Sequence, residues 1–255
     1  MGTRQHRINL AQTKYVFIIV TTLATIVLCI SSWVMAKTSA ISASIEPWIY
    51  GCEPVDLFFP LIASAPYAWV IYSERKNGFL EYVSTRTNVD KYIRNKMISY
   101  MLSAFVSVFI IYFFSLVFTL LLMSAKSSSE YSRVVLYLFG QAQLQKPLLF
   151  GFIWCIYKGA IGAMLCLLGQ IVSRHSTNLF VITITPMVYT FVENFVTASL
   201  GVAKFSLTTS FVLNRLTPQV MTVKNMSIGI VVLCVVIFLS SFLMKRKGKT
   251  ANVTA

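Results

Sequence analysis

Two charged side chains lie inside long apolar runs of the sequence and are the first candidates for chemistry. Lys158 lies in the run 148–171, and Glu193 lies in the run 179–200. At a rise of 1.5 Å per residue, their depths in two antiparallel helices would differ by only about 5 Å. An isolated charge in a bilayer costs at least a few kcal/mol, so such residues usually face a partner or a wet cavity. The sequence thus allows three interpretations: charges on a substrate path, a structural ion pair between Lys158 and Glu193, or side chains that extend to the membrane surface.

The second candidate is the basic hairpin, residues 74–96, a long charged passage between two apolar runs. Six Lys and Arg side chains lie in it, against Glu74, Glu81 and Asp90. A short basic loop beside membrane spans stays in the cytoplasm. One interpretation is a surface that contacts a soluble partner, and the other is an ordinary solvated loop. The charges alone do not distinguish between them.

The local pattern divides the basic hairpin into two helices. Apolar residues follow Gly78 and predict a short amphipathic helix, which the polar residues 84–87 interrupt. Asn88 is a good N-cap and Asp90 falls in the first turn, so a second helix is expected to begin there. That helix becomes wholly apolar from Tyr100. The pattern indicates a short helix along the membrane surface that leads into a spanning helix.

Catalytic and metal-binding motifs are missing from the sequence. The two histidines, His6 and His175, lie far apart, and neither H-E-x-x-H nor G-x-S-x-G occurs. Residues 248–250 resemble the end of a phosphate-binding loop, but Leu243 stands where its first glycine should be. We therefore expect no enzymatic activity and no metal or cofactor site in this chain.

Composition and apolar runs indicate a polytopic membrane protein. Of the 255 residues, 56% are hydrophobic and 12% charged. A run of about 20 apolar residues crosses a hydrocarbon core of about 30 Å. We predict an all-α, single-domain protein over residues 1–255 with six spans, at about 15–35, 56–72, 100–123, 148–171, 179–200 and 228–244.

Two of these regions are expected to be irregular. Pro60 and Pro66 lie in the second run, and a proline lacks the N–H that a helix interior needs, so this helix is predicted to kink or to begin late. Residues 201–227 alternate apolar with polar side chains, and Pro218 ends any helix. That alternation is typical of a re-entrant segment in the outer leaflet, although an ordinary outer loop remains open.

The basic residues also predict the orientation. With both termini inside, 14 Lys and Arg fall on the inner side and seven on the outer side, while Lys158 lies within a span. This bias favours cytoplasmic termini and an even number of spans. The net charge of +14 is spread between spans rather than gathered in one patch with aromatics, so lipid headgroups are expected partners and nucleic acid is not.

The basic hairpin resembles the loop between the second and third spans of ABC-2-type permeases. The resemblance lies in the order E-R-x-x-G-x-x-E, then S/T-x-R, then a basic helix entering a span. The matching residues are Glu74, Arg75, Gly78, Glu81 and Arg86. The six-span layout and the outer re-entrant segment extend the resemblance over nearly the whole chain.

This resemblance implies the membrane subunit of an ATP-driven exporter in a bacterial cytoplasmic membrane. In that family the hairpin is the coupling helix that sits on an ATPase, so the expected partners are two ATPase subunits and a second permease, identical or paralogous. ATP and Mg²⁺ would bind to the ATPase and not to this chain. The substrate, such as an antimicrobial peptide, a lipid or a drug, is not readable. The alternative is a membrane-embedded immunity or sensor protein that binds a peptide or lipid without transport.

Overall fold

The computed structural model describes residues 2–38, 43–86, 88–123 and 136–251, and every regular element among them is helical. The elements are α1 (Gly2–Thr38), α2 (Glu46–Lys76), α3 (Phe79–Ser84), α4 (Val89–Leu122), α5 (Gly140–Gln145), α6 (Pro147–Ser173), α7 (Leu179–Ser199), η2 (Ala203–Phe205), α8 (Leu207–Phe211) and α9 (Val223–Ala251).

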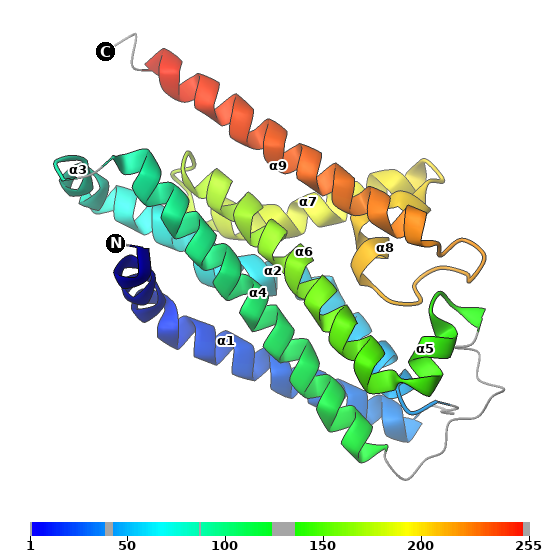
Figure 1. Cartoon of the computed structure of the whole chain (residues 1–255). Helices are drawn as coiled ribbons and strands as arrows, with labels where there is room; N and C mark the ends of the chain where they lie inside the picture. The colour runs from blue at the N-terminus through cyan, green and yellow to red at the C-terminus, as the bar shows by residue number, and fades with distance from the viewer. Residues whose placement is uncertain (1, 39–42, 87, 124–135, 252–255) are drawn as a thin grey trace.

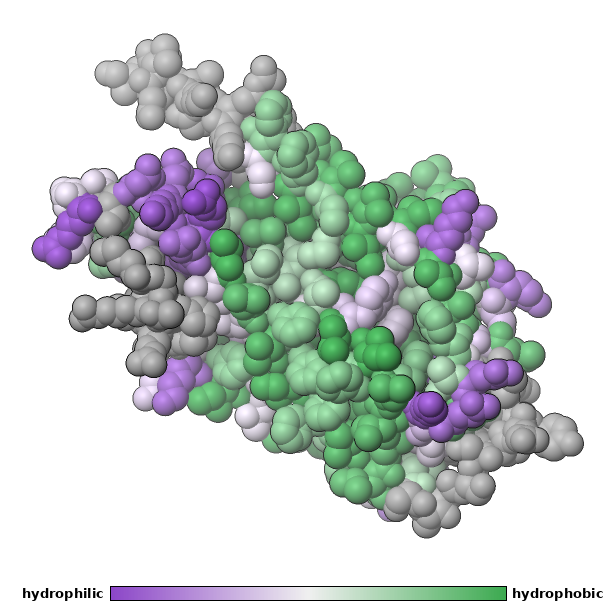
Figure 2. Space-filling model, in the orientation of Figure 1, coloured by the Kyte–Doolittle hydropathy of each residue, from purple (hydrophilic) through white to green (hydrophobic). Residues whose placement is uncertain are grey.

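Six helices in this described part are long and apolar enough to cross a membrane, as predicted. They are Thr13–Thr38 of α1, all of α2, α4, α6 and α7, and Val223–Phe242 of α9. An apolar belt covers the face shown in Figure 2, and hydrophilic side chains gather at its two ends. This distribution is that of a multi-pass membrane protein, in which the belt contacts lipid.

Helix α4 shows the membrane character residue by residue. Its exposed face is apolar, with Leu102, Phe114 and Leu121 each more than half exposed. Its buried face is rich in small hydroxyl side chains, and these have partners: Ser107 bonds the Tyr67 hydroxyl, at 2.6 Å between the two oxygens. Small and polar residues therefore join the helices while large apolar residues face outward, as expected in a lipid environment.

Helix α2 packs against α1, α4, α6 and α7 and thus forms the centre of the bundle. In Figure 1 the first turns of α1, the helix α3 and the last turns of α9 lie at one end, which we name the hairpin end. Helices α5 and α8 lie at the other end, the far end. The start of the first helix and the end of the last helix lie at the same end of the bundle (Figure 1), as expected for an even number of spans.

The second span was predicted to kink or to begin late, and the late start is wrong. Helix α2 begins at Glu46, ten residues before the predicted boundary, and continues through Pro54, Pro60 and Pro66. Proline removes one donor, but burial against four neighbouring helices holds the remaining turns in place. The earlier start matters for function because it moves Asp56 from a predicted helix end into the helix interior.

Close helix packing depends on glycine in α6. A Cβ on Gly151 would lie 2.4 Å from Leu116 Cδ2, and one on Gly162 would lie 2.9 Å from Val108 Cγ2. Both contacts are made with α4 of the same chain. Small residues let two helix backbones approach closely. In a membrane such close packing holds helices together, because the hydrophobic effect does not drive their association there.

The segment between α7 and α9 folds back onto the bundle through η2 and α8. The hydroxyl of Ser210 donates to the carbonyl of Met226, with 2.5 Å between the oxygens. Phe211 is buried against Phe59 of α2, with ring centroids 4.8 Å apart. Segment 201–222 is thus packed at the far end of the bundle, next to the start of α9 (Figure 1).

Candidate functional site

A buried ion pair joins α2 and α6 near the middle of the bundle. The Nζ atom of Lys158 donates to both carboxylate oxygens of Asp56, at 2.6 and 2.8 Å. The Tyr112 hydroxyl of α4 donates to Oδ1 of Asp56 at 2.5 Å, and its ring centroid lies 4.0 Å from the Lys158 ammonium. The side chains of Lys158 and Asp56 are 1% and 2% exposed. Three spans therefore meet at one fully paired charge cluster.

The two charges lie at matching depths. Asp56 and Lys158 come ten and eleven residues after the first residues of α2 and α6, which is roughly 15 Å along each helix. With the first residues of both helices placed at the surface of a hydrocarbon core of about 30 Å, this depth would be near its midplane. An ionisable group at that depth is stable only with a partner, and the geometry supplies a carboxylate, an ammonium and a phenol together.

The predicted pairing of Lys158 with Glu193 is wrong. Glu193 instead accepts hydrogen bonds from the hydroxyl of Ser206 (2.8 Å) and the backbone N–H of Leu207 (3.1 Å). Lys158 points toward α2 and α4, whereas Glu193 lies in the last two turns of α7, where the chain turns into α8. Similar depth was a necessary condition for pairing, but the rotation of each helix decided the partner.

Asp56 is the residue that sequence reasoning missed. It is the first residue of the predicted span 56–72 and follows a short polar segment that contains Glu46 and Glu53. A usable signal was present: Asp56 and Lys158 become equally deep once the second helix is extended back to its first polar residues. Nothing in the sequence pointed to Tyr112 as their third partner.

A polar cavity of about 360 Å³ opens beside this ion pair, between α2, α7, α8 and the residues after α8. Asp56 forms part of its wall, together with Glu53 and Arg215. The Arg215 guanidinium donates to Asn194 Oδ1 at 2.7 Å. Burial lowers the pKa of Arg215 from its ordinary value, while the nearby Glu193 carboxylate opposes that shift. Lining residues are Glu53, Asp56, Leu57, Thr190, Phe191, Asn194, Thr208, Phe211, Val212, Asn214 and Arg215.

The basic hairpin forms the second candidate site, and its helices begin where predicted. Gly78 has φ +69°, a left-handed conformation that L side chains rarely adopt, and it turns the chain from α2 into α3. The Asn88 side chain caps α4 by accepting the backbone N–H of Asp90 (2.9 Å) and of Lys91 (3.2 Å). The short helix α3 is thereby held between two long helices.

Glu74 and Arg75 brace the hairpin from inside and do not form its outer surface. Glu74 is 8% exposed and pairs with the buried Lys96 of α4, and its Oε1 also accepts from the Tyr92 hydroxyl at 3.1 Å. The Arg75 guanidinium donates to the backbone carbonyls of Arg174 and Ser176, in the loop between α6 and α7. These contacts tie α2 to α4 and to the α6–α7 loop.

Glu81 and Arg86, by contrast, are exposed at the hairpin end. Arg86 stacks on the Tyr82 ring, with its Cζ atom 4.7 Å from the centroid. Phe79 and Tyr82 are 41% and 53% exposed. A groove of about 560 Å³ lies beside α3 and is lined by Trp69, Val70, Ser73, Glu74, Asn77, Gly78, Phe79 and Tyr82. The surface combines aromatic rings with charge, a composition common at protein interfaces.

Within the described residues, no group of three or more His, Cys, Asp or Glu side chains is placed to hold a metal ion. The geometry thus shows two features: a buried ion pair inside the bundle, and a helical hairpin that is held by contacts to the bundle at one end. These features define a multi-pass, all-helical membrane protein. No protein-family model, curated protein or solved structure matches the chain.

Proposed function

We propose that this chain is the permease subunit of an ATP-driven exporter of the ABC-2 type. The observation that carries the proposal is the construction of the basic hairpin. Helix α3 exposes Glu81 and Tyr82, and Arg86 is exposed just after it, while contacts behind them connect α2 with α4 and with the α6–α7 loop. A force on α3 would therefore be transmitted to α2 and α4, which would move as rigid helices.

In this mechanism a separate ATPase binds ATP and Mg²⁺ and docks on α3, one ATPase for each of two permease chains. Closure of the ATPases moves α3 and tilts α2, whose interior carries Asp56 at the wall of the polar cavity. Separation of α2 from α7 and α8 at that cavity would open a path for the substrate. Segment 201–222 would act as the outer re-entrant element that covers this path.

The distribution of basic residues supports the orientation. By sequence position, 14 of the 22 Lys and Arg residues belong to segments at the hairpin end, so we place this end in the cytoplasm of a bacterial cell, with both termini on that side. Lipids surround the apolar belt, and a second permease, identical or paralogous, completes the transporter.

Co-purification tests the proposal. The tagged full chain is extracted from its native membrane in mild detergent, and the eluate is assayed for a separate ATP-hydrolysing subunit. Arg86→Glu should abolish recovery of that subunit, whereas Lys14→Glu, the same reversal at an exposed residue of α1, should not. Gly78→Pro should act like Arg86→Glu because proline cannot adopt φ +69°.

Two results would contradict the proposal. One is labelling of an Arg86→Cys variant by a membrane-impermeant reagent outside intact cells, which would place the hairpin on the outer side. The other is a full phenotype in a strain that lacks any such ATPase, which would favour the immunity or sensor protein.

A further inference from the structure

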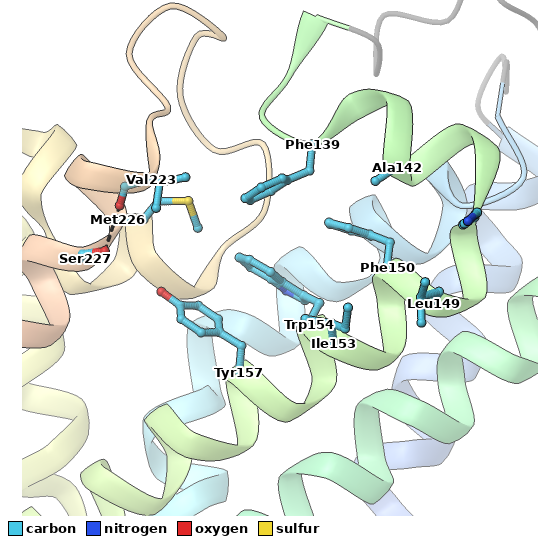
Figure 3. A pocket seen from close by; sticks show the side chains of 11 residues that line it. Phe139, Ala142, Leu149, Phe150, Ile153, Trp154, Tyr157, Val223, Met226 and Ser227 are labelled. Carbon is cyan, nitrogen blue, oxygen red and sulfur yellow. Dashed lines mark hydrogen bonds between the residues drawn. The ribbon is translucent and has the colours of Figure 1, made fainter.

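An apolar cavity of about 380 Å³ lies at the far end of the bundle, between α5, α6 and the first turns of α9 (Figure 3). Ligand pockets in proteins typically measure about 300–1,000 Å³. This cavity is separate from the polar cavity at Asp56, and the two share no lining residue. Its walls come from Phe139, Ala142, Lys146, Leu149, Phe150, Ile153, Trp154, Tyr157, Val223, Met226 and Ser227.

Aromatic rings form one continuous wall of the cavity. The ring centroids of Phe139 and Phe150 are 6.4 Å apart, those of Phe150 and Trp154 6.3 Å, and those of Trp154 and Tyr157 5.1 Å. Figure 3 shows these rings on one side and Val223 and Met226 on the other. The Ser227 hydroxyl is satisfied within α9 by the carbonyl of Val223, at 2.9 Å. The cavity therefore favours a long apolar group.

A single cation stands among the residues that line this cavity. Lys146 directly precedes α6 and is exposed, while none of the other ten lining residues is charged. Lys224, in the first turn of α9, is a second exposed cation next to the lining residue Val223. An occupant with a negative group at the Lys146 end and an apolar tail matches this arrangement.

The length of the cavity wall matches one leaflet of a bilayer. From Lys146 to Tyr157 is eleven residues, which is about 16 Å along α6. Half of a hydrocarbon core of about 30 Å is about 15 Å. A lipid with its headgroup at Lys146 would extend its acyl chain past the aromatic rings to the level of Tyr157.

We propose that this cavity binds one anionic phospholipid, with its phosphate at Lys146 and one acyl chain along Phe150, Trp154 and Tyr157. The lipid fills the space between α6 and α9 and so fixes α9 against the bundle. This site does not depend on the proposed transport function, because its geometry involves neither the basic hairpin nor the ion pair.

The test uses the purified full chain and native mass spectrometry with added phosphatidylglycerol or phosphatidylcholine. One phosphatidylglycerol should remain bound per chain, about fivefold more tightly than phosphatidylcholine, the effect of one lysine near a lipid surface. Lys146→Ala should remove this preference, whereas Lys204→Ala, which removes an exposed lysine within η2, should keep it. Ala142→Trp should fill the cavity and reduce retention of both lipids.

Fluorescence locates the lipid without a cavity-filling variant. Phosphatidylglycerol brominated in its acyl chains should quench the tryptophan emission of the wild type, and Trp154→Phe should remove that part of the quenching. Equal retention of the two lipids, equal behaviour of Lys146→Ala and Lys204→Ala, or quenching unchanged in Trp154→Phe would each overturn the proposal. An Ala142→Trp variant that still binds the lipid but no longer binds a second copy of this chain would also overturn the proposal, because the cavity would then be a contact between two chains.

Discussion

Two buried ion pairs join α2 to its neighbours, and they differ in how completely they are satisfied. Both carboxylate oxygens of Asp56 accept hydrogen bonds, from Lys158 and Tyr112. In Glu74 only Oε1 is used, by Lys96 and Tyr92, and no residue in the described part of the chain donates to the buried Oε2.

The difference follows from position. The Asp56 pair is buried in the interior of two candidate spans, where a missing partner costs several kcal/mol, so every acceptor must be filled. The Glu74 pair lies near the ends of its helices, and Glu74 lines the groove beside α3, although its Oε2 atom is itself buried. The first pair is a fully satisfied, fixed joint in the bundle, whereas the second leaves one buried carboxylate oxygen without a donor among the described residues.

Removing the acid of the central pair should have the largest effect. Asp56→Ala leaves Lys158 unpaired at a buried site, so we expect a loss of about 3–5 kcal/mol in the free energy of unfolding. Unfolding in mixed detergent–SDS micelles measures this loss. Asp90→Ala, the same change at an acid that is 87% exposed, is the control and should change stability by less than about 1 kcal/mol. Equal effects of the two changes would show that the central pair is not essential.

The corresponding change at the hairpin end should be smaller. For Glu74→Ala we expect a loss of about 2 kcal/mol in the same assay, because the long side chain of Lys96 can reach the membrane surface. An equal loss of stability in Glu74→Ala and Asp56→Ala would contradict the proposed difference between the two ion pairs. Glu74→Ala should also weaken recovery of the ATPase subunit, which Asp56→Ala refolded in lipid should retain.

The phenol hydroxyls separate the two pairs more finely. Tyr112→Phe removes one hydrogen bond from a filled carboxylate, so we expect a loss of about 1.5 kcal/mol. Tyr92→Phe removes the equivalent bond at the more accessible pair, where water can replace it, and should cost less than about 1 kcal/mol. Unfolding midpoints of both variants in one detergent test this order, and a reversed order would contradict the assignment of the fixed joint.

The smallest effect is expected for the surface ion pair at the hairpin end. Arg174 and Asp90 lie 3.1 Å apart, with side chains 30% and 87% exposed. We expect Arg174→Ala to cost between 0 and 1 kcal/mol and to lose even that difference in high salt. A loss comparable to that of Glu74→Ala would mean that the α6–α7 loop braces the hairpin through this contact.

Much of the fold was predictable because the bilayer constrains the chain so strongly. The predicted spans 15–35, 148–171 and 179–200 agree with candidate spans of the structure to within three residues at both ends, and the Asn88 cap and Gly78 marked the hairpin helices. The second span was placed ten residues too late because charges and prolines usually mark helix ends. The ion pair with Lys158 offsets the cost of burying the Asp56 charge inside a helix. The hydropathy of a single run cannot show this, because the partner lies in another helix.

The sequence by itself determined which segments cross the membrane, since about 20 apolar residues have no stable place in water. It also determined where the helices around the basic hairpin begin, because capping and left-handed turns depend on local residues. Only the tertiary structure decided that Lys158 pairs with Asp56, that Glu74 is buried, and that aromatic rings from α6 face α9 across a cavity. Those facts depend on the rotation of each helix about its axis, which is set by contacts between residues about a hundred positions apart.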